Sequence, residues 1–434
     1  MCDIINIGMK HVVHKTMLTP PKYGSKFYAC DGMRVQIVRR PLKRTLFVLA
    51  AIICFFAATL ILMLDLRNNA ELAEWWTTHI EAGLERLFGT LTSWIPFSVL
   101  EFFIVCLIGL GVFMYVRLIV NLGRKRFRAI ALGVLSIGTV AMYVLNMYVM
   151  TMAFAYYRAE MPIPQSDREY DGQQAIAVVR YFLDDYNKLA NSLPRDKNGC
   201  VECPYTFSEL AERIKIEYAR LDSDYFNEYT PTAKPIVNSW FMSQMLITGI
   251  TFLPTGEASV NTAAPPTSQT VTLAHELAHS KGVAREGDAE LLARYILLTS
   301  DDGYLRYCGY YAAFYNLLDA LWLAGEDDAY IELGLSISPL VSAEQWYAYE
   351  YWNSQPNIIG QIAEFFNNWY LESNGAENGT GSYDDGNKSE IVIPTDPITG
   401  EPEKDPETNE PIKIIVYSQV QKMFFAIYEA KTNS

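Results

Sequence analysis

The residues in this sequence best suited to chemistry form the run His275-Glu276-Leu277-Ala278-His279. Two histidines four residues apart lie on one face of a helix, so their imidazoles can bind one metal ion. The glutamate between them can act as the general base towards a water molecule that the metal activates. The whole chain has five histidines, so finding two of them at ligand spacing around a glutamate is a specific signal for a zinc hydrolase.

Catalytic zinc usually has three protein ligands, and the third is expected to be a carboxylate because no histidine other than His275 and His279 follows His79. Gly282 is predicted to end the motif helix in a left-handed cap, so that the next helix brings acidic residues back towards the metal. Three acids are candidates. Glu286 is the first choice for the ligand, and the alternatives are Asp288 and Glu290. An acid that does not bind the metal can hold a ligand imidazole in its tautomer, and all three also fit an ordinary helix start.

A hydrolase of this kind also needs a donor that stabilises the oxyanion formed from the substrate carbonyl. Tyr307 is the first candidate, followed by Tyr310 and Arg306. A structural role is the alternative for these tyrosines, since the chain has 28 of them. The apolar run 245–253 is predicted to be a short strand whose edge accepts an extended peptide substrate.

Three apolar segments, about 45–64, 97–116 and 129–154, have the length that a helix needs to cross a bilayer. Lys and Arg are concentrated before the first segment and between the second and third, which predicts that both of these stretches are cytoplasmic. Residues 1–44 are therefore expected inside, residues 45–157 in the membrane region and residues 158–434 outside. A cleaved signal peptide is the alternative for the first segment, but its apolar stretch begins too late in the chain and is too long.

The charge of the chain changes sharply after the third apolar segment. Residues 1–158 carry 17 Lys and Arg against 8 Asp and Glu, whereas residues 159–434 carry 18 against 41. An acidic outer part excludes nucleic acid as a partner, because it has no basic surface to neutralise phosphates. The partners that remain are the lipid membrane and a peptide or protein substrate. The sequence indicates no particular oligomeric state.

The outer part is predicted to be mainly α-helical with a small β element. Apolar residues at helical spacing predict the following helices: 176–193, 206–221, 289–298, 307–323, 345–371 and 417–431. Residues of about 374–412 are acidic and rich in proline, and they are predicted to be a poorly ordered insertion without chemistry. Outside the membrane, a disulfide among Cys200, Cys203 and Cys308 is plausible.

Three stretches of the sequence resemble a bacterial membrane family named domain of unknown function 3810 (DUF3810), which is regarded as zincin-like. They are GITFLPTGEASVN, HELAHSKGVAREGDAE and DDGYLRYCGYYAAF. The resemblance implies three N-terminal membrane helices before a helical zincin-like domain, in a bacterial cell membrane. The HExxH stretch, with its downstream Glu and Ala, also resembles the Glu-x-x-Ala-Asp pattern of gluzincin peptidases. By that pattern Glu286 corresponds to the metal-binding glutamate, and Glu290 replaces the usual Asp or Asn. The insertion at about 374–412 is additional to the family pattern.

Together these features predict a membrane-anchored zinc metallopeptidase with an extracytoplasmic site. His275, His279 and Glu286 are the expected zinc ligands and Glu276 is the expected general base. The alternative is a catalytically silent zincin-like receptor or scaffold that binds a peptide or protein partner. An intact Glu276 argues against that alternative, because binding alone does not need a base.

Overall fold

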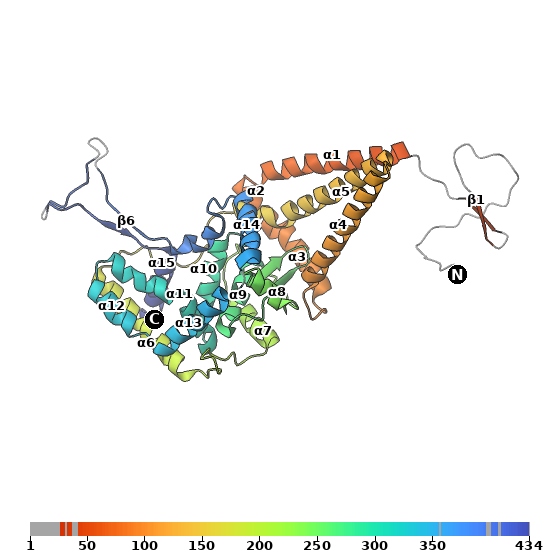
Figure 1. Ribbon diagram of the computed structural model, residues 1–434. Helices are drawn as coiled ribbons and strands as arrows, with labels where there is room; N and C mark the ends of the chain where they lie inside the picture. Colours follow the sequence, from red (N-terminus) through yellow and green to blue (C-terminus); the bar gives the residue numbers. More distant parts are fainter. Residues whose placement is uncertain are drawn as a thin grey trace.

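The computed structural model describes residues 27–30, 33–36, 42–355, 357–395, 401–406 and 409–433. The described chain is mainly helical, as predicted, and three long apolar helices stand apart from a compact helical domain (Figure 1). These helices are α1 (Leu42–Leu66), α4 (Val99–Gly123) and α5 (Phe127–Tyr148). Three stretches are long and apolar enough to cross a membrane, namely 43–66, 99–123 and 127–157. The three predicted spans are therefore confirmed as apolar helices, with their ends moved by a few residues.

The three apolar helices meet at the end far from the helical domain and diverge towards it (Figure 1). Helix α5 lies between the other two and packs against both α1 and α4. The turn between α4 and α5 contains Arg124, Lys125 and Arg126, and it lies at the same end as the start of α1. Of the predicted N-terminal segment 1–44, the described part before α1 is a two-stranded hairpin, β1 (Phe27–Cys30) with β2 (Met33–Gln36), and the rest lies outside the described residues.

The segment between α1 and α4 folds onto the helical domain. It forms α2 (Ala70–Trp76), a short π-helix η1 (Thr77–Glu81) and α3 (Ala82–Thr92). Gly256 of the domain has a φ of 62° and approaches α3 so closely that a Cβ there would lie 2.2 Å from the Gly89 nitrogen. Glycine is required at such a contact, because any side chain would collide with the α3 backbone. This segment is therefore part of the domain.

The core of the domain is a set of packed helices around α11 (Gly303–Leu323), which contacts five others. The five are α6 (Gly172–Ser192), α9 (Pro266–His279), α10 (Glu286–Thr299), α12 (Asp327–Leu335) and α15 (Gln419–Thr432). Helix α7 (Phe207–Tyr218) packs on α9 and α10. Reciprocal capping boxes explain where α6 and α7 begin, since Asp171 pairs with Gln174 and Thr206 with Glu209.

Two features of the helical pattern differ from the prediction. Helix α12 was not predicted, and the single helix predicted over 345–371 is two helices, α13 (Pro339–Asn353) and α14 (Asn357–Ser373). The helices predicted over 176–193, 206–221, 289–298, 307–323 and 417–431 are present as α6, α7, α10, α11 and α15, with ends that differ by up to four residues. Cys200, Cys203 and Cys308 are free thiols, so the structure contains no bridge among them.

A three-stranded sheet lies beside α9. Its order is β3 (Ala233–Pro235), β5 (Glu257–Val260), β4 (Gly249–Phe252), with β3 parallel and β4 antiparallel to β5. One strand was predicted here, over 245–253. The strand β4 occupies only Gly249–Phe252 of that range, and residues 245–248 are a turn and linker after the short helix α8 (Ser239–Gln244). Among the described strands β4 pairs on one side only, which leaves it an edge strand.

The predicted poorly ordered insertion is wrong for its first part. Residues Gly379–Asn387 form a 3-10 helix, η4, that packs against α10, α14 and α15. The strands β6 (Glu390–Val392) and β7 (Ile414–Val416) then form an antiparallel ladder that extends away from the domain (Figure 1). Residues 396–400 and 407–408 of the predicted insertion lie outside the described residues.

Candidate metal centre

Helix α9 holds the histidine motif inside the core of the domain. Its last two turns carry four apolar side chains that are fully buried, Leu273, Ala274, Leu277 and Ala278. The helix ends at His279, and Gly282 follows with a φ of 80°, the left-handed conformation predicted for it. The chain then reverses and α10 begins at Glu286. This reversal brings the first turn of α10 back alongside the last turn of α9.

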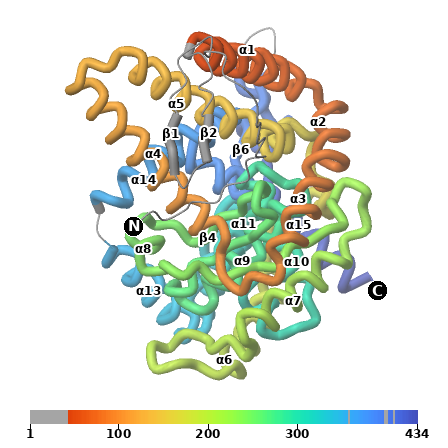
Figure 2. Tube along the Cα trace, turned by 90° about the vertical axis from the view of Figure 1, so that its right-hand side faces the viewer, coloured from red at the N-terminus to blue at the C-terminus, as the bar shows by residue number. Residues whose placement is uncertain are grey.

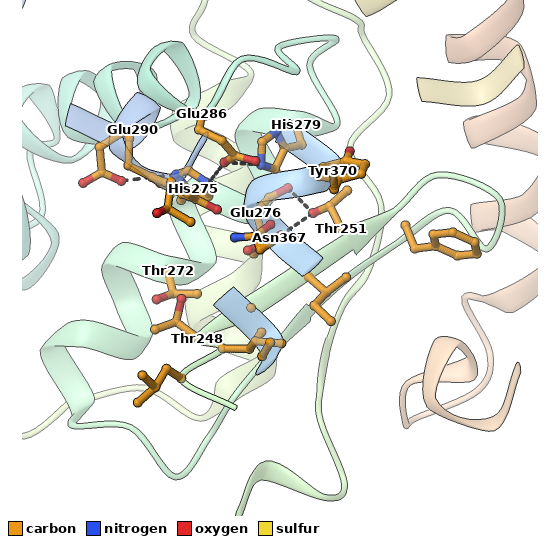
Figure 3. Close-up of a pocket in the computed structure, with 18 of the residues that line it drawn as sticks. Thr248, Thr251, Thr272, His275, Glu276, His279, Glu286, Glu290, Asn367 and Tyr370 are labelled. Atoms are coloured by element: carbon orange, nitrogen blue, oxygen red, sulfur yellow. Dashed lines mark hydrogen bonds and ion pairs between the residues drawn. The ribbon is translucent and has the colours of Figure 1, made fainter. Parts of the chain in front are cut away.

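The structure brings His275, His279 and Glu286 together in one cluster (Figure 3). Glu286 Oε2 lies 3.0 Å from His275 Nε2 and 3.4 Å from His279 Nε2. Zinc bonds of about 2.1 Å at tetrahedral angles hold donor atoms roughly 3.4 Å apart, so these separations suit a single zinc ion. Two imidazoles and one carboxylate are also a donor set that zinc prefers at catalytic sites.

Both histidines are held by their other ring nitrogen. His275 Nδ1 lies 3.2 Å from Glu290 Oε2, and His279 Nδ1 lies 2.8 Å from the carbonyl oxygen of Val283. Glu290 is in turn fixed by Arg294, 3.0 Å away. An imidazole that donates from Nδ1 has its Nε2 lone pair free for a metal, and such partners orient metal-binding histidines in proteins. The hydrogen-bond partners of the two imidazoles therefore also fit a bound zinc ion.

The histidines and the carboxylates of the cluster shift one another's pKa values towards the charged forms. Burial would lower the pKa of His275, but the hydrogen bonds and charges of Glu286 and Glu290 raise it well above its usual value. Burial would likewise raise the pKa of Glu286, yet the facing imidazoles of His279 and His275 hold it well below its usual value. The same imidazole of His275, with Arg294, lowers the pKa of Glu290 to about 2. Both carboxylates therefore stay ionised in a buried place that favours positive charge.

Glu276 lies between the cluster and the edge strand β4. Its Oε2 accepts a hydrogen bond of 2.7 Å from the hydroxyl of Thr251, as Figure 3 shows. On the same strand, a Cβ at Gly249 would lie 2.6 Å from both Cγ and Oε1 of Glu276. The strand thus fixes one carboxylate oxygen and provides the close packing that only glycine permits.

A cavity of about 1330 Å³ opens above the cluster. Its wall opposite α9 is built by α14 and η4, and Figure 3 shows Asn367 and Tyr370 of α14 among the side chains that line it. From η4, the ring of Tyr383 stacks on His275 with 5.8 Å between ring centroids and 24° between planes. Burial, together with the nearby charges of Glu286 and Glu276, raises the pKa of the Tyr383 hydroxyl, so this group keeps its proton beside the cluster.

The predicted oxyanion donor Tyr307 is wrong. Its side chain is fully buried away from the cavity, and its hydroxyl donates to Glu344 over 2.6 Å and accepts from Arg195 over 3.2 Å. The other two candidates, Tyr310 and Arg306, both bind Asp185 instead. None of the three lines the cavity as far as the described residues define it. Tyr307 and Tyr310 are core residues because α11 presents its apolar period inwards, and Arg306 is half-buried beside Asp185.

The two alternative third ligands occupy other positions. Asp288 accepts a hydrogen bond of 2.7 Å from Arg285 and lines a separate, smaller cavity of about 350 Å³. Glu290 orients His275 from the side away from the cluster centre. Sequence reasoning missed Tyr383, Tyr370 and Asn367. No sequence signal points to Tyr383, which lies in the stretch predicted to be without chemistry.

A family model described as protein of unknown function (DUF3810) matches residues 76–386. The chain belongs to the DUF3810 family. Searches of curated proteins and of solved structures find no match. The DUF3810 region begins at Trp76, so it includes α3, and it ends at Gly386, so it includes Tyr383. The start of the predicted insertion is therefore part of the DUF3810 pattern and is not an addition to it.

Proposed function

We propose that this DUF3810 protein is a membrane-anchored zinc metallopeptidase. The observation that carries the proposal is the convergence of one ring nitrogen each of His275 and His279 with a Glu286 oxygen, all within 4.8 Å of one another. Glu276 lines the same cavity. A structural ion site would need no free carboxylate next to the ion and no open cavity above it. Here both are present, and they suit hydrolysis.

In this proposal His275, His279 and Glu286 hold the zinc ion. When bound, zinc supplies a Lewis acid that polarises a carbonyl group and lowers the pKa of water. Glu276 acts as the general base and later returns the proton to the leaving amine. Thr251 keeps the Glu276 carboxylate in place through Oε2, and the other oxygen remains for the proton.

The peptide substrate lies along β4. The described strands leave one edge of β4 unpaired, and residues Gly249–Phe252 line the cavity together with Glu276. An extended peptide can add to such an edge as one more strand, with its backbone amides and carbonyls paired to the protein. This places a peptide carbonyl above the cluster. Tyr383, which lines the cavity and stacks on His275, is the donor that we assign to the developing oxyanion.

We place the metal centre outside the cytoplasm. The basic turn between α4 and α5 lies at the end of the apolar helices that is far from the domain (Figure 1). Basic residues in short connections favour the cytoplasmic side, so the domain at the opposite end faces outwards.

The proposal is tested with the full-length chain purified in detergent. Metal analysis should find one zinc per chain, and a peptide library should yield cleavage products. His275→Ala should lose the zinc and all cleavage, while Glu276→Gln should keep the zinc and lose cleavage by a factor on the order of 10³ or more. His79→Ala is the matched control, because His79 is exposed on η1 and should change neither.

Well-folded protein without zinc would refute the proposal outright. Zinc binding with unchanged cleavage in Glu276→Gln would remove Glu276 from its role. Zinc binding with no cleavage of any peptide by the wild type would instead favour the silent receptor.

A further inference from the structure

Helix α14 has an apolar stripe that no other part of the described structure covers. The side chains of Ile358, Ile362, Phe365 and Trp369 follow the helical spacing of four, three and four residues. They are 74%, 55%, 67% and 62% exposed. The neighbouring face of the same helix carries Asn367 and Tyr370 into the cavity above the metal centre. One helix therefore separates the cavity from an open apolar surface.

The C-terminal part of α14 is tied to the end of the third apolar stretch. The hydroxyl of Tyr156 donates to that of Tyr370 over 3.1 Å. The ring of Tyr148 meets the ring of Tyr370 edge-on, with 5.7 Å between centroids. Both Tyr148 and Tyr156 belong to the stretch 127–157 that is apolar enough to cross a membrane.

The N-terminal part of α14 lies against α8, and α8 is tied to the start of the apolar helix α4. Gln244 of α8 donates to Gln355 over 2.7 Å, next to the start of α14. Glu101 of α4 accepts hydrogen bonds from the backbone nitrogens of Val237 and Asn238, at 2.7 and 3.0 Å. Helix α14 thus bridges the ends of α4 and α5 that face the domain, and Figures 1 and 2 both place α8 and α14 near these ends.

Helix α8 adds to the open apolar surface. Trp240 and Phe241 are 69% and 41% exposed. We call these two residues and the four of the α14 stripe the apolar rim. The edge strand β4 lies near the start of α4, as the rim does, because Phe252 of β4 meets Phe103 of α4 with 5.9 Å between ring centroids. Phe103 is the fifth residue of α4 and so lies about 6 Å along the helix from its start.

The cavity opens beside this rim. Phe241 and Ile362 of the rim line the cavity, together with Met152 from the third apolar stretch. The same cavity continues to His275 and Glu276. Monomeric soluble domains rarely expose a contiguous apolar surface of this kind, whereas tryptophan and phenylalanine side chains are favoured where a protein meets the bilayer interface.

We propose that the apolar rim lies in the interfacial layer of the bilayer that holds α4 and α5, and that the metal centre takes its substrate from that layer. The substrate class is the juxtamembrane segment of a membrane-embedded polypeptide. Such a segment reaches β4 in an extended form while its apolar anchor stays in lipid. This substrate assignment rests on the proposed peptidase function. The lipid contact of the rim rests on geometry alone.

The lipid contact is tested with the full-length chain in phospholipid vesicles. A photocrosslinking amino acid, benzoylphenylalanine, replaces Phe365 of the rim, and its adducts are identified by mass spectrometry after irradiation. The matched control places it at Leu335 on α12, which is 84% exposed but far from the apolar helices (Figure 1). Lipid adducts are expected at position 365 and not at 335. Absence of lipid adducts at 365, or equal yields at both positions, would overturn the proposal.

The substrate class is tested with one cleavable sequence presented in two forms, as a free peptide and fused to a transmembrane helix in the same vesicles. Wild-type protein should cleave the anchored form faster. The double variant Phe365→Glu/Trp369→Glu should keep its zinc and its rate on the free peptide, and lose roughly tenfold on the anchored form, because charge is disfavoured in the interface. Ile331→Glu/Leu335→Glu on α12 is the control, with the same spacing on an exposed apolar surface.

Equal loss on both forms, no loss on the anchored form, or faster cleavage of the free peptide by the wild type would overturn the substrate assignment. Failure of the peptidase function looks different. In that case the wild type lacks zinc or cleaves neither form, while the lipid adducts at position 365 still form.

Discussion

The floor and the rim of the cavity are built on opposite principles. The floor is polar and buried, and each of its main groups has a partner: His275 faces Glu290, His279 faces a backbone carbonyl and Glu276 faces Thr251. The rim is apolar and open, and its side chains are 41–74% exposed. Buried polar groups need partners to be stable, whereas apolar groups need only to leave water.

This difference separates chemistry from access. In the proposed peptidase, a change on the floor alters zinc binding or the groups around the ion, so its effect should be the same for every substrate and in detergent or lipid. A change on the rim should matter only where lipid is present. We expect the effects of substitutions on zinc binding and cleavage to be largest at the third ligand and to become smaller with distance from the cluster.

The largest effect is expected at the third ligand. Glu286→Gln removes the charged oxygen that lies between both imidazoles, so zinc affinity should fall by a factor on the order of 10³ and cleavage with it. Zinc titration against a competing chelator measures this. Asp288→Asn is the control and should bind zinc like the wild type, since Asp288 is held by Arg285 away from the cluster. Loss of zinc in the control alone would assign the ligand to the other acid.

The next effect separates two tyrosines. Tyr383→Phe should lower kcat by a factor on the order of 10² with little change in KM, because it removes a donor that acts on the oxyanion. Tyr307→Phe should keep kcat and lower the free energy of unfolding by about 1–3 kcal/mol, since Glu344 and Arg195 each lose a buried partner. Steady-state kinetics and thermal unfolding on the same preparations measure both. The reverse pattern would restore Tyr307 to the active site.

A smaller effect is expected at Glu290, which contacts the ligand His275 and not the expected position of the metal. Glu290→Gln keeps the size of the side chain but removes the charge that orients His275, so zinc affinity should fall by about 10- to 100-fold. Zinc should still bind at high concentration, and cleavage should then recover. Cleavage that stays low at saturating zinc would show that Glu290 contributes to the reaction itself.

The smallest effect on zinc binding and cleavage is expected for Glu81, a carboxyl on the wall of the cavity that acts on stability instead. Full burial raises the pKa of Glu81 to about 8, against weaker lowering by Thr77 and Arg158. Between about pH 4.5 and 8 the folded chain thus holds a proton that the unfolded chain releases, so this group makes stability fall as the pH rises. Glu81→Gln should flatten that fall, by at most roughly 5 kcal/mol at pH 8 and above. If the substitution leaves the pH dependence of the melting temperature unchanged across this range, the Glu81 carboxyl is in contact with water.

The parts of the site that sequence predicts are those set by local spacing. The two histidines, the left-handed Gly282 and the return to Glu286 all follow from one helix, its cap and the next helix start. The three apolar helices follow in the same way from length and composition. Local rules suffice there, because the residues that act together are close in the chain.

The opposite wall could not be predicted, because it depends on distant packing. Tyr383 reaches His275 across more than a hundred residues, from a stretch whose composition is typical of a loop. The apolar period of 345–371 continues across two helices and hides the break between α13 and α14. Tyr307 was misassigned because the sequence does not show which tyrosines of this helix point to the cavity, and the fold turns Tyr307 into the core.

The side chain of Arg158 follows the third apolar stretch directly and joins three parts of the molecule. It forms an ion pair with Glu74 of α2 at 2.5 Å, and it donates to the carbonyls of Gly282 and Tyr225 at 2.8 and 2.6 Å. Gly282 lies in the turn that joins the two histidines to Glu286. Proteolytic cleavage just after this arginine would therefore remove a support of the turn before Glu286, and α3 would stay with the membrane part. Release from the membrane would then disturb the proposed metal centre, and a water-soluble form should be sought by redesigning the apolar helices and keeping the chain whole.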